Sequence, residues 1–298
     1  MQLTAQTTPV FRSSARRSNP LGLIREAASE LWSRRRLVAY LVRADLKKKG
    51  ADTLLGNLWW VIDPLLQMLV YVILVSVIFA RAQPDYPLFI FAAILPWKWF
   101  STAVNDATAA VAGQDRLIKQ VRFPLLVLPT AAVAAGVANF AFGLVPLGAM
   151  LLILYPDRIS PYLVFIPVIA AVQLVFSLAV GLVVSALNVF YRDIGNLSRH
   201  VLRLWFYLSP ALYGPATVHR LAEGHPTLFR VIELNPFYTL FTAYRSVIYG
   251  AETIEGSSIP PLAPDWGALA TLLAVSLVLL ALATVFFKRL EPTFAKVL

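Results

Sequence analysis

The sequence predicts an all-α integral membrane protein with six transmembrane helices per protomer. Of its 298 residues, 58% are hydrophobic and only 14% are charged, whereas a soluble domain carries roughly 25% charged residues. The apolar residues form long runs, and a run of about 20 is enough to cross a bilayer as one helix. Most Lys and Arg residues lie beside these runs, as expected of segments that stay on the cytoplasmic side.

The part of the chain before the first apolar run is strongly basic. We expect residues 1–30 to form a disordered tail, because they are rich in Ser, Thr, Gln and Arg. No apolar stretch precedes these charges, which argues against a cleaved signal peptide and for a cytoplasmic N-terminus. Residues 31–57 are predicted to form an amphipathic cytoplasmic interface helix, where Trp32 and Tyr40 suit the headgroup region. A plain juxtamembrane anchor is the alternative.

Six spans follow, and an even number places both chain ends in the cytoplasm. They are predicted at residues 58–80, 88–111, 125–154, 162–190, 202–214 and 266–287. The fifth run is too short to cross the membrane as one helix. Residues 215–261 contain no clean span, and Asn235-Pro236 interrupts their apolar part. That pattern predicts re-entrant helices between spans five and six, covered by protein rather than lipid.

Polar residues within the predicted spans require a structural reason. Asp63 followed by Pro64 predicts the N-cap and the first helical residue of the first span. Asp63 and Gln67 then lie at its cytoplasmic mouth, where we expect them to face a partner helix or a water path. Lys98 lies inside the second span beside aromatic residues. We expect it either to extend toward the interface or to mark a later start of that span.

A short charged segment, GQDRLIKQVRFP at residues 113–124, separates the second and third spans. Folded as a helix, it places apolar residues on one face and basic residues on the remainder. These are Leu117, Ile118 and Val121 on the apolar face, and Arg116, Lys119 and Arg122 elsewhere. One hypothesis is a solvated loop that obeys the positive-inside rule. The other is a docking helix that a soluble partner pushes.

The chain carries no motif for energy conversion or catalysis of its own. It lacks G-x-x-x-x-G-K-[ST], G-x-S-x-G and H-E-x-x-H. It has no Cys, and its three His residues have no metal-ligand spacing. We therefore expect no enzyme and no catalytic, cofactor or metal residue, which favours the docking hypothesis. The basic residues sit beside spans, so anionic lipids explain them better than a nucleic-acid partner.

Four stretches, in this order, resemble the membrane permease of type 2 ABC exporters. They are LLGNLWWVIDPLLQMLVY, LIKQVRFPLLVLP, NVFYRDIGNLSRHVLRLWFYLSPALY and LNPFYTLFTAYRSVIYG. The resemblance is to the branch that exports O-antigen, teichoic acid and related lipid-linked glycans, and it covers roughly residues 34–298. It implies a homodimer in the cytoplasmic (inner) membrane, bound to two copies of a separate ABC ATPase subunit that holds ATP and Mg²⁺.

The same resemblance implies roles for particular segments. Residues 114–123 would be the coupling helix that docks on the ATPase, the interface helix would rest on it too, and residues 215–261 would form outer gate helices. The implied ATPase contacts are Gln114, Arg116, Leu117, Ile118, Lys119, Val121, Arg122, Phe123, Leu37, Leu41 and Lys48.

The first and fifth spans are implied to flank the translocation path, where a glycan would stack on aromatic faces and accept polar contacts. The candidates are Trp60, Asp63, Gln67, Tyr71, Trp205, Tyr207 and Tyr213. A packing or interface role is the alternative for each aromatic residue. Asp63 departs from the neutral Asn expected in many relatives.

Two other functions remain open from the sequence. One is an exporter permease for drugs or small amphiphiles. The other is a membrane-embedded glycosyl or polyprenyl transferase, which would need clustered acidic residues to hold a metal and a pyrophosphate. Asp52, Asp115 and Asp193 are scattered, and no D-x-D or D-x-x-D occurs.

Overall fold

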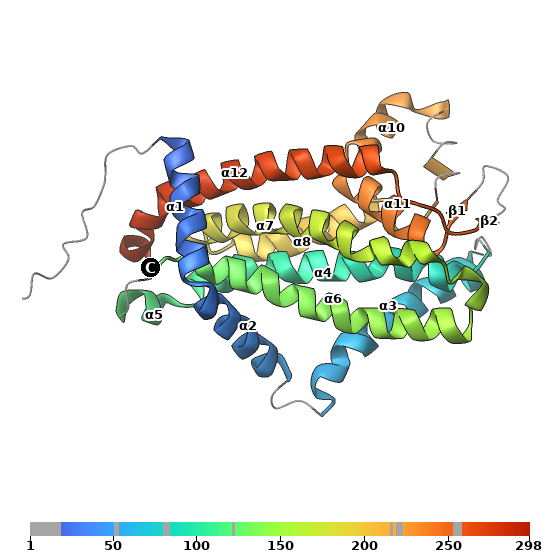
Figure 1. The fold of residues 1–298 in the computed structure, drawn as a ribbon, viewed down its shortest axis with the longest axis horizontal. Helices are drawn as coiled ribbons and strands as arrows, with labels where there is room; N and C mark the ends of the chain where they lie inside the picture. The colour runs from blue at the N-terminus through green and yellow to red at the C-terminus, as the bar shows by residue number, and fades with distance from the viewer. Residues whose placement is uncertain are drawn as a thin grey trace, which may run out of the picture.

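The computed structural model is a long bundle of helices (Figure 1). It describes residues 19–50, 54–79, 84–120, 123–214, 217–218, 223–252 and 258–298. Within these ranges, five helices are long and apolar enough to cross a membrane: Trp59–Ile78, Tyr86–Ala112, Val127–Ile153, Pro161–Phe190 and Trp266–Val297. The chain is therefore a multi-pass membrane protein, as the composition predicted.

The helix α4 (Tyr86–Ala112) lies at the centre of the bundle. It contacts α6 (Val127–Ile153), α7 (Ile166–Phe190) and α3 (Trp59–Val72), while α12 (Trp266–Val297) packs on α7. Within the most apolar part of α4, 78% of the residues are buried. Within the most apolar part of the first span, only 11% are buried. A helix that is apolar all round belongs in an interior, so α4 forms the core and the first span lies at the edge.

Two apolar clusters hold the bundle together. The larger one contains an aromatic centre in which Trp97 and Phe100 of α4 meet Phe237, with ring centroids 4.6 and 4.7 Å apart. The smaller one lies at the end of the bundle where α5 (Asp115–Gln120), α1 (Pro20–Ser33) and the last turns of α12 gather (Figure 1). We call this the α5 end.

The helix α1 corrects the prediction that residues 1–30 form a disordered tail. It begins at Pro20, and its Leu23 and Ala27 are buried, with α1 packed against α12. Composition alone pointed to disorder, but the apolar contact with α12 stabilises a helix there. Residues 1–18 lie outside the described part. The predicted interface helix corresponds to α2 (Arg35–Gly50), which packs on α6.

The predicted N-cap of the first span is also wrong. The helix α3 begins at Trp59, after a 3₁₀ turn at Gly56–Leu58, and Pro64 lies inside it, so Asp63 is no N-cap. The span then continues as a π-helical stretch, Ile73–Ile78. The local pair Asp63-Pro64 is compatible with both positions; in the structure the preceding Trp60 is already helical and packs on Phe142 of α6.

The region around the predicted fifth span is broken into short elements. The helix α8 (Ile194–Leu208) begins earlier than the predicted 202–214 and is not among the five long apolar helices. After it come α10 (Pro226–Glu233), α11 (Pro236–Ile248) and a two-stranded pair of β1 (Ala251–Glu252) with β2 (Ser258–Ile259). These last elements lie at the opposite end of the bundle from α5 (Figure 1). Six spans and re-entrant gate helices stay predictions.

Candidate functional site

The helix α5 connects α4 to α6 within the segment predicted as a coupling helix. Ile118 is buried in the cluster at the α5 end, and Phe123 packs against that cluster. Lys119 donates from Nζ to the backbone oxygen of Leu298, 2.6 Å away, while Gln114 is exposed. Ile118 thus anchors α5 to its own protein rather than facing outward. The side chains of Arg116 and Leu117, and all of Val121 and Arg122, lie outside the described part.

The helix α2 presents a mixed surface near α5. Lys48 is exposed, Leu37 is half-buried, and Leu41 packs against the cluster at the α5 end. Lys49 is bound by Asp45 at 2.8 Å and by Asp106 of α4 at 2.6 Å. Burial alone lowers the pKa of Lys49, but the charges and hydrogen bonds of these carboxylates outweigh it and raise the pKa. The C-terminal end of α2 is therefore fixed to α4.

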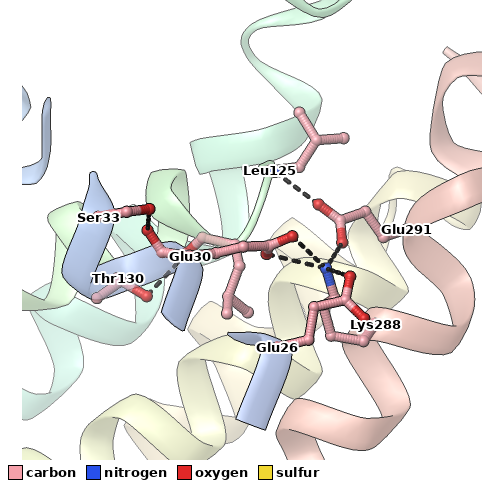
Figure 2. A network of polar contacts seen from close by, with 8 residues as sticks. Glu26, Glu30, Ser33, Leu125, Thr130, Lys288 and Glu291 are labelled. Carbon is pink, nitrogen blue, oxygen red and sulfur yellow. Dashed lines mark hydrogen bonds and ion pairs between the residues drawn. The ribbon is translucent and has the colours of Figure 1, made fainter. Parts of the chain in front are cut away.

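A buried lysine of α12 lies between three carboxylates at the α5 end, as Figure 2 shows. Lys288 Nζ is 2.9 Å from Glu30, 3.2 Å from Glu26 and 2.9 Å from Glu291. Glu291 also accepts a hydrogen bond from the backbone N–H of Leu125 at 2.6 Å. Burial raises the pKa of the Glu30 carboxyl, although Lys288 acts in the opposite direction. Sequence reasoning missed this network.

The predicted path residues lie mainly on α3 and α8, which contact each other. Tyr71 of α3 is buried against Phe206 of α8, with ring centroids 5.7 Å apart. Tyr207 is exposed and Tyr213 half-buried. Trp205 is half-buried, packs edge-on against Phe237 and donates from Nε1 to Asn235 at 3.0 Å. These contacts match the packing role that the sequence left open as the alternative.

Two further path candidates, Trp60 and Asp63, line a cavity of about 350 Å³ between α2, α3, α4 and α6. Trp60 stands at its wall, with its ring centroid 5.1 Å from that of Phe142. The carboxylate of Asp63 forms an ion pair with Lys98 Nζ at 2.5 Å. This contact gives Lys98 a partner that neither sequence hypothesis named. Gln67 lies one turn further along α3 and is half-buried.

A second buried cation that the sequence reasoning missed lies at the other end of the bundle. Arg245 of α11 donates hydrogen bonds to the carbonyls of Phe89, Pro210 and Ala211. Its guanidinium carbon lies 3.6 Å from the ring centroid of Phe89. The available indication was an Arg within the apolar stretch LFTAYRSVIY. No group of three metal-ligating side chains occurs among the described residues.

A bundle of long apolar helices is the architecture of a multi-pass membrane protein. A family model for the ABC-2 type transporter matches residues 36–249, and the chain belongs to this family. The expected resemblance to ABC exporter permeases is confirmed.

Named relatives narrow the comparison. The chain is 35% identical over 267 residues to the O-antigen export system permease protein RfbA of Myxococcus xanthus, covering 90% of this chain and 97% of the relative. Two proteins of the same name from Klebsiella pneumoniae are 24% and 26% identical, each covering 88% of this chain and 95% of the relative.

Proposed function

We propose that this protein is the transmembrane subunit of an ATP-driven exporter that moves a lipid-linked polysaccharide across the cytoplasmic membrane. The observation that carries the proposal is the 35% identity, along 90% of the chain, to a protein named as an O-antigen export permease. The lack of any nucleotide-binding motif is consistent with a subunit that relies on a separate ATPase.

The α5 end is the proposed docking side, and it faces the cytoplasm in this proposal. On α2, the side chains of Lys47 and Lys48 are exposed, and Leu41 of the same helix packs against the cluster at the α5 end. ATP and Mg²⁺ would bind only to the partner subunit. The exposed side chains of Gln114, Lys119 and Lys48 are described candidates for contact with it, while Ile118 and Phe123 would hold α5 in place.

A second copy of the chain would complete the translocation path. The first span exposes a continuous set of apolar side chains: Leu66, Leu69, Val70, Ile73, Val77 and Ile78. Next to it, α8 leaves Leu204, Tyr207 and Leu208 exposed. Such a large apolar area can face lipid tails or another protein. We infer that the α3 and α8 surfaces of two protomers face each other and that the glycan passes between them.

The decisive experiment isolates tagged protein from mild detergent and identifies the bound soluble subunits. We expect an ABC ATPase in roughly equal amount, and its loss when Arg116, Lys119 and Phe123 are all changed to Ala. Arg230→Ala is the matched control, because this exposed Arg lies on α10 at the opposite end. A protein isolated without any ATPase would refute the proposed mechanism.

Depletion of the protein in cells tests the substrate. We expect lipid-linked glycan to accumulate on the inner leaflet. Drug sensitivity without such accumulation would point to an exporter of small amphiphiles. Turnover of a sugar nucleotide by the purified chain alone would point to a transferase.

A further inference from the structure

We propose that the last part of α12, residues Lys288 to Leu298, is a clamp that ties α5 to α1, so that the three move as one body when a partner displaces α5. In this proposal Glu291 is a positioning residue for transport. The inference rests on the proposed function, because it assumes that a soluble subunit acts on α5. We call residues 288–298 the α12 clamp.

The length of α12 places the clamp beyond the bilayer core. The helix has 32 residues, which at about 1.5 Å per residue spans about 48 Å, whereas the hydrocarbon core is about 30 Å thick. The apolar part ends at Phe287, and the charged residues Lys288, Arg289 and Glu291 follow. The surplus turns reach the α5 end, next to α1 (Figure 1).

One side of the clamp is bound to α1 through Lys288. The side chain of Lys288 is only 6% exposed, and both Glu26 and Glu30 of α1 bind its Nζ atom. A buried ammonium that loses its carboxylates is strongly destabilising, because no water replaces them. Leu23 and Ala27 are buried on the same helix. Separation of α1 from α12 would therefore expose both a buried charge and an apolar contact.

The other side of the clamp is bound to the chain that leaves α5. Glu291 binds Lys288 through one carboxylate oxygen and the N–H of Leu125 through the other, as Figure 2 shows. Leu125 lies just before α6, where backbone N–H groups have no partner within the helix. A carboxylate is also stabilised near a helix N-terminus. Glu291 is thus the one described side chain that joins Lys288 to the start of α6.

The clamp also contacts α5 itself. Lys119 binds the backbone oxygen of Leu298, and Phe287, Phe294 and Ile118 belong to the same apolar cluster. Phe294 and Phe287 are fully buried, with ring centroids 5.3 Å apart. A force on α5 therefore reaches α12 through packed side chains on one side and through Glu291 on the other. Because packed interiors are not easily deformed, α1 follows.

Three variants of the assembled exporter test this proposal in proteoliposomes. Glu291→Ala removes both contacts of Glu291. Glu291→Gln keeps an acceptor for Leu125 but loses the ion pair with Lys288. Arg289→Gln is the matched control, since it removes an exposed charge of the same clamp and leaves the contacts of Lys288 and Glu291 in place. Retained ATPase subunit, ATP hydrolysis and glycan exported per ATP are measured for each.

We expect Glu291→Ala to retain the ATPase subunit and to hydrolyse ATP within about twofold of the unchanged protein. Export per ATP should fall about tenfold, with about threefold for Glu291→Gln and less than twofold for Arg289→Gln. Unchanged export per ATP in Glu291→Ala would overturn the proposal. So would a variant that loses the ATPase subunit and export together, because Glu291 would then only shape the docking surface.

A distance measurement separates coupled motion from mere stability. The chain contains no Cys, so Ser29→Cys on α1 and Gln120→Cys on α5, both at exposed positions, can carry spin labels without background. We expect their distance to stay constant when ATP is added, and to change with ATP in Glu291→Gln. An ATP-dependent change already present in the otherwise unchanged protein would refute the one-body motion. Failure of the unchanged protein to bind an ATPase or export glycan would instead refute the proposed function.

Discussion

Arg245 offers the sharpest test of how the broken region around α8 and α11 is held together. Pro210 and Ala211 follow the end of α8, where backbone carbonyls have no partner within a helix. Arg245 is 5% exposed and donates to both of these carbonyls and to that of Phe89. An unsatisfied polar group in an apolar interior is costly, so this one side chain makes the break in the chain tolerable.

The perturbation is Arg245→Met, which keeps an apolar stem and removes the donors. A hydrogen bond to a charged group contributes about 1.5–3 kcal/mol, and bonds that share one group do not add fully. We therefore expect a loss of about 3–5 kcal/mol in the free energy of unfolding. At about 2–4 °C per kcal/mol, the midpoint of thermal unfolding in detergent should fall by about 6–20 °C.

The assay is thermal unfolding of the purified protein, followed by size-exclusion chromatography of the remaining fraction. Arg245→Lys should lie between Met and Arg, because its three donors share one nitrogen and cannot spread as a guanidinium does. Arg230→Met, at an exposed position on α10, should shift the midpoint by less than about 2 °C. Equal midpoints for Arg245→Met and Arg230→Met would show that the carbonyls find other partners and would refute the reasoning.

Two further predictions concern packing and ionisation. A Cβ at Gly143 of α6 would lie 2.1 Å from Leu95 of α4, whereas at Gly148 nothing lies within 4 Å. Gly143→Val should therefore destabilise the protein by about 1–3 kcal/mol, and Gly148→Ala should be neutral or stabilising by up to about 1 kcal/mol; equal unfolding midpoints would contradict this. The raised pKa of Glu30 means that its favourable contribution is complete below its usual pKa of 4.5 and is lost as pH rises through the folded-state value. Glu30→Gln should thus be at least as stable as the unchanged protein at pH 7, with this advantage shrinking toward pH 4.5. Unfolding midpoints are measured across that range, and an advantage that grows toward pH 4.5 would contradict the prediction.

Several features of the protein were readable from local sequence. Length and hydropathy of the apolar runs predicted all five long helices, because a bilayer requires a minimum length and few charges. Their ends lie within a few residues of the predicted bounds, except that the last helix continues past residue 287 to Val297. The short charged segment between the second and third spans indicated α5. The break at Asn235-Pro236 is where α11 begins, with Asn235 accepting from the N–H of Phe237 as a cap.

Composition was misleading where a segment depends on a distant partner. Residues 20–30 were assigned to the disordered tail with the polar, basic residues before them, yet they form α1, which buries Leu23 and Ala27 and packs against α12. The alternation of polar and apolar residues in such a segment gives no information on what lies against it. The neighbours of Trp205 were likewise not readable from local sequence, since Phe237 and Asn235 lie in another element.

The sequence by itself determined that this protein lies in a membrane and in which order its helices follow, because both depend on runs of neighbouring residues. Only the tertiary structure decided the partners of its charges. Lys98 of α4 pairs with Asp63 of α3, and Lys288 pairs with Glu30, which is 258 residues away in the sequence. Each charge needs a compensating group once it is removed from water, but the packing of the bundle selects which group that is.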